Sequence, residues 1–418
     1  MRETTLTGAT ASDQMTLRRS NLALVLRSLR EGGPRSRARL ATELGLTRSA
    51  VSKLVAELAE RGLVRIGDLE RGSVGRPGTS VSLDGRAVCG IGAEINVHHV
   101  SALALDLAGE VVAEHFEPLN DDRLSADEVI GRLVQLVTRT EADVARLGVE
   151  PVGVTVGVAG LIDHSRDLLT VGPNLDWGQV PVGDLVRHGL DRAYPVTFDN
   201  EGNLAAIAEA VPGDPERQDI LVIFGEVGVG GGIVADGRLL RGRHGFAGEF
   251  GHMIVEPQGR LCGCGRVGCW ETVCGLRALL DAAADPDDAV RDPELGLQER
   301  LAEINRRAGL GDTRTLAALE QVGGWVGVGA AVLTNALNPS VIVLSGYFAE
   351  VGYHMLPAIE AGLLEGVLAP DAGGTRVELS TLGFNAAVRG GARLALETVF
   401  NDPTSIPRHV AATTGATR

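Results

Sequence analysis

The sequence predicts an N-terminal winged helix-turn-helix domain followed by a larger α/β body made of two lobes. Three observations support this fold class. A helix-turn-helix pattern lies between Leu17 and Leu63, a Gly-rich hairpin pattern follows it, and one strand–turn–strand layout occurs twice in the remaining chain. We expect domains at residues 1–86 and 87–400, with a flexible tail at 401–418.

Length and charge agree with this division. A chain of 418 residues with 44% hydrophobic residues is long enough for two or three domains. Residues 1–86 contain 15 Arg or Lys and 9 Asp or Glu, a net charge of +6, whereas the rest contains 24 and 45, a net charge of −21. A basic segment on an acidic body indicates that the small domain meets a polyanion. A merely solvated basic surface is the alternative.

The sequence also indicates a location. No apolar run reaches the length needed to span a bilayer, and the first residues lack the apolar segment of a secretory signal. We therefore expect a cytoplasmic protein. Four of the five cysteines lie between Cys262 and Cys274. In a cytoplasmic chain this clustering favours a metal site over disulfides.

The helix-turn-helix prediction rests on three spacings. Ala41 is small where two helices would cross, Gly45 suits the turn, and Val51 would pack the second helix against the first. Thr47 is the expected N-cap of that second helix. Its outward face carries short donors and cations: Arg48, Ser49, Ser52 and Lys53. With Thr47, these residues are the expected contacts to double-stranded DNA in the major groove, and a protein-interaction module is the alternative.

A wing is predicted directly after these helices. The stretch VRIGDLERGSVGRPGTSVSLD, residues 64–84, indicates two strands around a Gly-rich tip. Arg76 lies in that tip and is expected to reach the minor groove or the DNA backbone.

The two lobes are predicted from a repeated layout. Residues 89–115 and residues 219–242 each indicate two strands joined by a turn, then a second turn and a third strand. Helical patterns follow each repeat, at 125–147 in the first half and at 274–283 and 297–337 in the second. Two α/β lobes would place a ligand cleft between them.

A metal site is predicted in GHMIVEPQGRLCGCGRVGCWE. This stretch places His252, Cys262, Cys264 and Cys269 within 18 residues. One imidazole and three thiolates make a closed tetrahedral set for zinc, and without an open position the zinc would be structural. A cluster of reactive thiols is the alternative. Cys89 and Cys274 are expected to be ordinary buried thiols.

Several stretches together resemble the ROK family (repressor, open reading frame, kinase): GEVGVGGGIVADGRLL, GFAGEFGHM, CGCGRVGCWE, PNLDW and DNEGN. The resemblance covers essentially residues 17–400 and implies a two-lobed actin- and sugar-kinase-like fold. Members with a winged helix in front are transcriptional regulators, commonly of sugar catabolism, and members without it are mostly sugar kinases. The cysteine stretch is similar to the zinc loop of the family.

The resemblance also implies a sugar pocket. Planar polar side chains that make paired hydrogen bonds recognise adjacent hydroxyls. The residues at the family's sugar-contacting positions are Asn174, Asn200, Glu201, Glu249, His252 and Glu271. Metal on one ring nitrogen of His252 would leave the other nitrogen to meet a hydroxyl. For each residue alone, an exposed polar side chain without a ligand is the alternative.

Three departures from the family's kinases argue against catalysis. The kinases carry Asp-x-Gly-Gly-Thr in the first phosphate loop, where this chain has Glu94–His98, reading EINVH, and branched Val97 would block a phosphate. The second loop keeps its glycines but carries Glu226 near a phosphate-contacting threonine position, where a carboxylate would repel triphosphate. Glu201 also stands where the kinases keep the aspartate that takes the hydroxyl proton.

We therefore expect no catalytic residue and no bound ATP. The Asn-Glu-x-Asn version of the pocket motif resembles that of xylose-operon repressors of the family. The resulting hypothesis is a sugar-responsive DNA-binding transcriptional regulator, a repressor of carbohydrate metabolism, that forms a homodimer or homotetramer. The alternative is an ATP-dependent sugar kinase with an accessory DNA-binding domain. Asp199 receives no role.

Overall fold

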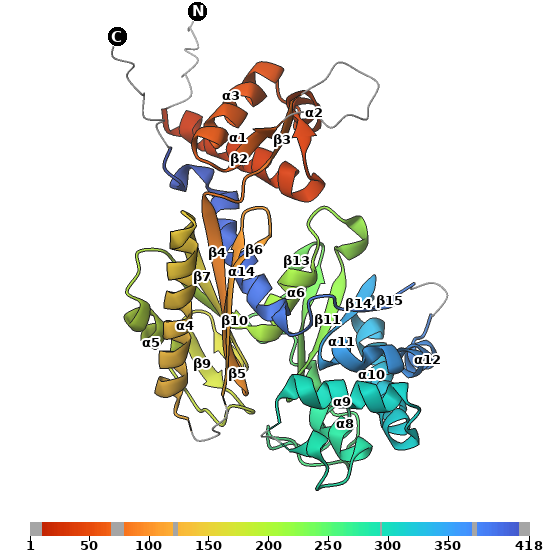
Figure 1. Ribbon diagram of the computed structural model, residues 1–418. Helices are drawn as coiled ribbons and strands as arrows, with labels where there is room; N and C mark the ends of the chain where they lie inside the picture. Colours follow the sequence, from red (N-terminus) through yellow and green to blue (C-terminus); the bar gives the residue numbers. More distant parts are fainter. Residues whose placement is uncertain (1–10, 68–78, 120–123, 293–294, 370–373, 409–418) are drawn as a thin grey trace, which may run out of the picture.

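The computed structural model describes residues 11–67, 79–119, 124–292, 295–369 and 374–408. The winged helix lies at one end of the molecule, and the two lobes lie side by side beneath it (Figure 1). The predicted fold class is confirmed.

The N-terminal unit consists of three helices and a small antiparallel sheet of order β1-β3-β2. Its elements are α1 (Ala11–Gly32), β1 (Arg35–Ser36), α2 (Arg37–Glu43), α3 (Arg48–Glu60), β2 (Val64–Gly67) and β3 (Ser80–Leu83). Gly45 has φ +64° in the turn between α2 and α3, a conformation that costs glycine little. Ala41 and Val51 are buried where α2 and α3 meet. Ala41, Gly45 and Val51 therefore occupy the positions in the helix-turn-helix that the sequence predicts.

Lobe 1 is a five-stranded sheet of order β10-β7-β4-β5-β6, with β4, β5 and β6 antiparallel and β7 and β10 parallel to β4. Its strands are β4 (Val88–Ile95), β5 (His99–Asp106), β6 (Val111–Pro118), β7 (Glu150–Val158) and β10 (Val196–Asn200). Helices α4 (Ala126–Arg146) and α5 (Val182–Leu190) and the hairpin β8 (Leu161–Asp163) and β9 (Leu168–Val171) complete the lobe.

Lobe 2 repeats this topology with the sheet order β13-β12-β11-β14-β15. Its strands are β11 (Ile220–Gly225), β12 (Val229–Ala235), β13 (Arg238–Leu239), β14 (Val341–Gly346) and β15 (Arg376–Leu379). Its helices are α7 (Glu271–Cys274), α8 (Leu276–Ala283), α9 (Leu297–Gly309), α10 (Thr313–Leu337), α11 (Tyr347–Val351) and α12 (Leu356–Gly366). In both lobes a three-stranded meander is extended by two parallel strands, so the repeat seen in the sequence is a repeat of the fold.

Two helices cross between the lobes. Helix α6 (Glu201–Glu209) packs against β11 and β12 of lobe 2 and against α14 (Ala386–Asn401), which also lies on β4 and β7 of lobe 1 (Figure 1). Glycines allow the close crossing: a Cβ at Gly390 would lie 1.8 Å from the carbonyl oxygen of Leu204, and one at Gly202 would lie 2.7 Å from Gly231. Both crossing helices are therefore held by backbone contact.

The winged helix shares a hydrophobic cluster with lobe 1. Leu26 of α1, Leu105 of β5 and Phe400 of α14 belong to one continuous set of buried side chains. Arg30 of α1 lies 4.1 Å from the Phe400 ring centroid and pairs with Glu397. The N-terminal domain is thus packed on the C-terminal end of α14.

The expected flexible tail at 401–418 is wrong for residues 401–408. Pro403–Ser405 forms a short 3-10 helix, and Ile406 is buried in the cluster shared with the winged helix. Arg61 donates hydrogen bonds to the carbonyl oxygens of Thr404, at 3.1 Å, and Ile406. Apolar burial and these bonds order a segment whose polar composition had indicated a tail. Residues 409–418 lie outside the described part of the chain.

The expectation that no apolar run could span a membrane is also corrected. Helix α10 has 25 residues, and by length and apolar composition it alone among the described helices could cross a bilayer. Over half of its most apolar window, 56%, is buried inside the protein, where Val322 and Val326 belong to the core of lobe 2. Such burial is that of a core helix in a folded domain.

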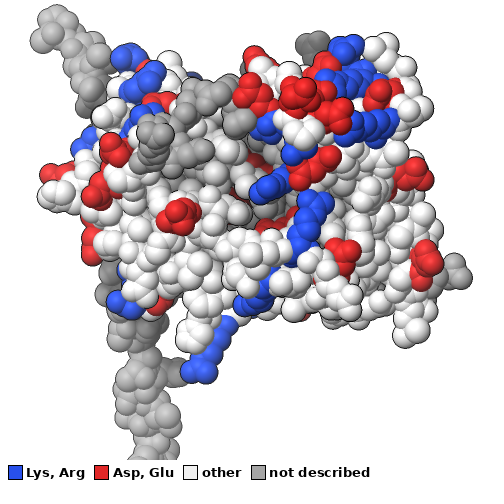
Figure 2. Space-filling view, turned by 90° about the horizontal axis from the view of Figure 1, so that it is seen from below, with Lys and Arg blue, Asp and Glu red and all other residues white. Residues whose placement is uncertain are grey.

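The face of the body seen from below carries both positive and negative side chains (Figure 2). Figure 2 shows that basic and acidic side chains lie interspersed over the lobe 2 half of the face seen from below. On α8 and nearby loops, Asp281 pairs with Arg260 and Arg291, and Asp288 pairs with Arg307 of α9. The charges of Asp281 and Asp288 are therefore locally compensated.

Candidate functional site

The candidate DNA surface is the outward face of α3. Five predicted contact residues are exposed on or just before this helix: Thr47, Arg48, Ser49, Ser52 and Lys53. Thr47 is the N-cap, and its hydroxyl oxygen accepts a hydrogen bond from the Ala50 backbone N–H at 3.2 Å. The opposite face of α3 is buried, so the cations point outward as a major-groove helix requires. Arg76 lies outside the described residues, and its DNA contact stays a prediction.

The base of α3 is tied to the rest of the protein through Glu57. Its buried carboxylate accepts hydrogen bonds from Arg18 at 2.7 Å and Arg61 at 2.9 Å and pairs with Arg408 at 2.7 Å. Burial alone would raise the pKa of Glu57, but these three guanidinium groups lower it below its usual value. Helix α3 is therefore anchored to α1 and to the C-terminal segment at the same carboxylate.

The six predicted sugar-binding residues line one pocket between the lobes. Asn174 follows β9, Asn200 and Glu201 lie at the junction of β10 and α6, and Glu249, His252 and Glu271 come from lobe 2. The last three lie on or beside the 3-10 helix at Phe250–His252 and at the start of α7. The structure thus brings the predicted set together, and ligand contact stays a prediction.

Asn200 is partly used by the protein itself. Its side-chain oxygen accepts hydrogen bonds from the backbone N–H groups of Gly202, at 2.8 Å, and Asn203, at 3.4 Å, so it caps α6. Its amide nitrogen donates to the Gly160 carbonyl at 3.0 Å. One N–H of Asn200 remains for a ligand. The cap also fixes the position of Glu201, the first residue of α6.

The pocket is strongly acidic. Burial raises the pKa of Glu201 well above its usual value, and the nearby carboxylates of Glu226, Glu94 and Glu249 raise it further. Burial, with Glu271 nearby, raises the pKa of Glu249 to about 7. The cavity of about 60 Å³ has room for about four waters, so a sugar needs the lobes or the side chains to move apart.

Two glycines of the second loop, Gly231 and Gly232, are needed for close packing. A Cβ at Gly231 would lie 1.9 Å from the carbonyl oxygen of Val222, and one at Gly232 would lie 2.6 Å from that of Gly202. These glycines let β12 pair with β11 and let α6 cross the strand closely. Packing therefore requires glycine at 231 and 232, whereas a Cβ at Gly230 would meet no atom within 4 Å.

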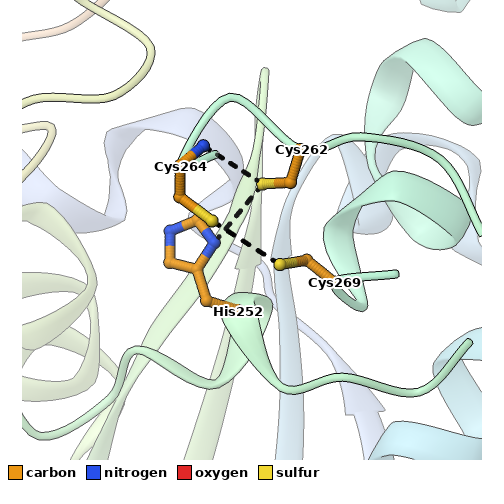
Figure 3. A group of neighbouring side chains, drawn as sticks. All are labelled: His252, Cys262, Cys264 and Cys269. Atoms are coloured by element: carbon orange, nitrogen blue, oxygen red, sulfur yellow. Dashed lines mark hydrogen bonds between the residues drawn. The ribbon is translucent and has the colours of Figure 1, made fainter. Parts of the chain in front are cut away.

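The predicted metal ligands form one group. The ligand atoms of His252, Cys262, Cys264 and Cys269 all lie within 4.8 Å of one another, and the side chains converge on one point (Figure 3). The Cys264 and Cys269 sulfurs are 3.6 Å apart, and Cys262 Sγ is 3.7 Å from His252 Nδ1. These distances fit a tetrahedron with bonds of about 2.3 Å, whose edges are about 3.8 Å. Among the described residues this is the one such group.

The metal group borders the pocket through two shared residues. His252 turns Nδ1 toward Cys262, which leaves Nε2 as the ring nitrogen not committed to the cluster. Glu271 Oε1 lies 2.7 Å from Cys262 Sγ, while Oε2 accepts a hydrogen bond from the Val229 backbone N–H at 3.4 Å. A metal bound by these cysteines would therefore help to orient two pocket residues.

Two groups of side chains that join the lobes were not predicted from the sequence. Asn96 and His99 of lobe 1 approach Glu226 of lobe 2. Asp199, 1% exposed, accepts hydrogen bonds from Arg241 of lobe 2 at 2.7 and 3.1 Å and lies 3.4 Å from His164. Asp199 is thus a structural partner between the lobes. Its polar neighbours in DNEGN gave no sign of the distant arginine.

Fold and site define the class of protein: a winged helix-turn-helix joined to a two-lobed sugar-kinase-like body with a polar interlobe pocket. The sequence profile of the ROK family matches residues 90–398, and that of the MarR family matches residues 23–72. The chain belongs to the ROK family.

Proteins similar in sequence to this chain include repressors and a sugar kinase. The chain is 28% identical to the xylose repressor of Bacillus spizizenii over 389 residues, 92% of this chain and 97% of that protein. It is 28% identical to the transcriptional dual regulator NagC of Escherichia coli over 350 residues, 82% and 84% of the two chains. A glucokinase of Halalkalibacterium halodurans is 31% identical over 249 residues, 57% of this chain and 74% of that protein.

Among solved structures, too, a transcriptional regulator aligns over more of this chain than a sugar kinase does. A ROK family transcriptional regulator described as a homologue of the E. coli MLC protein superposes with a TM-score of 0.73 at 23% identity, covering 92% of this chain and 97% of that one. The ROK glucokinase of Streptomyces griseus, in complex with glucose and AMPPNP, gives 0.63 at 28% identity and covers 74% and 99%. Among these proteins, those named as regulators or repressors align over more of the chain than the kinases do.

Proposed function

We propose that the protein is a sugar-responsive transcriptional repressor of carbohydrate metabolism. One observation carries the proposal: the helix that begins in the pocket at Glu201 packs on α14, and the winged helix packs on the far end of α14. Relatives named as repressors align over both parts. Ligand-dependent movement of the lobes would therefore reorient α3 relative to the body, and DNA as the partner implies a cytoplasmic location.

The effector that best fits the pocket is an unphosphorylated sugar. Asn174, Asn200 and His252 offer hydrogen-bond donors, and carboxylates such as Glu201 and Glu249 accept hydrogen bonds from hydroxyls. A sugar phosphate would bring a dianion beside buried carboxylates without a facing Lys or Arg among the lining residues. A neutral polyol avoids this repulsion.

Zinc is the metal that best fits the His252 and cysteine group, with a structural role. Three thiolates and one imidazole suit zinc, and the ion would hold the loop that carries His252 beside the pocket. Bound zinc would deprotonate Cys262, whose pKa burial and Glu271 otherwise raise.

Binding rather than phosphoryl transfer is supported by the groups at the phosphate positions. Val97 lines the pocket where the family's kinases keep glycine, and Glu226 places a carboxylate there. Of the glycines that remain, Gly231 and Gly232 are accounted for by packing. ATP-dependent sugar phosphorylation, the competing function, would need the nucleotide to displace these side chains.

Two copies of the winged helix are expected to act together. A homodimer or homotetramer would read half-sites about one helical turn, roughly 10 bp, or a multiple of it apart. A sugar changes operator affinity only by its differential affinity for the two lobe arrangements.

The test combines DNA and sugar binding. Fluorescence anisotropy with the DNA upstream of the protein's own gene should show that one unphosphorylated sugar from a panel changes operator affinity. Glu201→Gln should abolish that response and keep operator binding without sugar. An ATP-coupled assay with the same panel distinguishes the kinase: sugar-dependent turnover above about 1 s⁻¹ would refute the proposal.

A further inference from the structure

The two repeats place unlike side chains at matching positions. Asn96 is the first residue after β4 in lobe 1, and Glu226 is the first residue after β11 in lobe 2. Because the two meanders face each other across the cleft, these turns meet. The Asn96 amide nitrogen donates a hydrogen bond to Glu226 Oε2 at 2.6 Å. A side-chain contact thus joins the lobes where the family's kinases bind phosphates.

Asn96 also links this contact to the pocket. The same amide nitrogen lies 3.1 Å from Glu94 Oε1 and 3.3 Å from Glu201 Oε2. An amide nitrogen has two hydrogens, so these three carboxylates compete for two donors. At least one carboxylate oxygen needs another proton, which makes the arrangement sensitive to protonation.

His99 faces the two carboxylate oxygens that Asn96 leaves unsatisfied. Glu94 Oε2 and Glu226 Oε1 are buried without a hydrogen-bond partner. His99 Nε2 lies 3.8 Å from the first and Nδ1 lies 3.6 Å from the second. A neutral imidazole offers one N–H and turns a lone pair toward the other oxygen, whereas an imidazolium offers a donor to each. His99 is also stacked on Phe116, with ring centroids 4.9 Å apart.

The pKa values of His99 and Glu226 are both raised. Burial alone would lower the pKa of His99, but Glu94 and Glu226 raise it above its usual value. Burial raises the pKa of Glu226 to about 7 despite the opposing effect of His99. Groups whose pKa is raised in one state stabilise that state at low pH and lose this effect as the pH rises through the raised value. Both groups therefore favour closed lobes at low pH, and the contribution of Glu226 is lost as the pH rises through about 7.

The other charged groups near His99 do not reverse the preference for closed lobes at low pH. Glu201 carries a raised pKa for the same reason of burial among carboxylates. On the neighbouring strand β6, Glu117 is paired with Arg132 of α4. Among the charged groups that act on His99, Glu94 lies on β4 and Glu226 follows β11, so one belongs to each lobe.

We propose that Glu94, Asn96, His99 and Glu226 form a proton-linked clasp that holds the lobes closed. The clasp closes when His99 is protonated and opens when the pH rises and the facing carboxylates repel each other. Closure itself does not depend on the proposed function. Its consequence does: because Asn96 also contacts Glu201, sugar binding would become pH-dependent.

The test measures lobe separation without sugar. Small-angle X-ray scattering of the ligand-free, full-length protein between about pH 5.5 and pH 8.5 should show an increase in radius of gyration with a midpoint near pH 7. Glu226→Gln replaces the repelling carboxylate with an isosteric amide and should keep the protein compact to the highest pH. His99→Gln removes the cation and should move the midpoint about one pH unit or more lower.

His115→Gln is the matched control, because His115 pairs with Asp143 in lobe 1, away from the cleft, and should leave the midpoint unchanged. Circular dichroism at each pH verifies folding. A radius of gyration independent of pH in the wild type would overturn the proposal. If the midpoint pH shifted in the same direction in Glu226→Gln and His99→Gln, the proposal would also be overturned, because a general loss of stability would shift both variants alike. The operator assay is a separate measurement, so it can fail while the clasp stands.

Discussion

Gly390 tests whether the pocket helix and the helix under the DNA-binding domain are joined by close backbone contact. In Gly390→Ala, the new Cβ would lie 1.8 Å from the Leu204 carbonyl oxygen and 2.5 Å from its carbon. A backbone neighbour cannot rotate away, so α14 or α6 must shift by more than 1 Å to restore an ordinary contact. Overpacking costs about 1–3 kcal/mol, and Ala regains about 1 kcal/mol of helix propensity over Gly. We expect a net loss of up to about 2 kcal/mol.

Urea unfolding followed by circular dichroism measures this loss. The matched control is Gly131→Ala in the exposed face of α4, where no atom lies within 4 Å of the new Cβ. That variant should gain about 0.5–1 kcal/mol, because only helix propensity changes. In the operator assay, Gly390→Ala should also weaken the response to sugar. If Gly390→Ala is as stable as Gly131→Ala and responds normally, the crossing does not couple the two helices.

Three further outcomes are expected. Cys264→Ser should remove bound zinc in elemental analysis, whereas Cys89→Ala should keep it; equal zinc in both would exclude the proposed ligand set. Lys53→Ala should weaken operator binding about fivefold to tenfold, equivalent to about 1 kcal/mol, while Arg277→Ala on distant α8 should not; equal effects would argue against α3 as the DNA-contacting helix. Arg61→Ala should speed hydrogen exchange at residues 403–408, because charged hydrogen bonds of about 1.5–3 kcal/mol are lost; unchanged exchange would show that Ile406 burial alone holds the segment.

Local rules were sufficient for much of the fold. The turn at Gly45, the cap at Thr47 and the repeated meanders follow from backbone freedom, capping and period-two patterning, which act within a few residues. The group of His252 and the three cysteines could also be predicted from the sequence, because its residues lie close together in the chain. The pocket residues came from the resemblance to the ROK family, and the structure brings them together.

Long-range contacts set the limit. The pairing of Asp199 with Arg241 joins two lobes, and neither residue's neighbours indicate it. The segment after α14 looked polar and mobile, yet Arg61, more than 300 residues away, holds it in place. For the clasp a signal existed: Asn96 and Glu226 follow the first strands of the two repeats. From the sequence alone these residues indicate the loss of phosphate binding, and nothing near them in the chain shows that their side chains meet.

The measurement that tests the central claim most directly is operator affinity with and without sugar in the wild type and in Glu201→Gln. The account predicts that at least one unphosphorylated sugar changes wild-type operator affinity by about tenfold, a coupling of about 1.4 kcal/mol, and leaves Glu201→Gln unchanged. Operator affinity that no sugar in a hexose and pentose panel alters, or an equal response in Glu201→Gln, would contradict it.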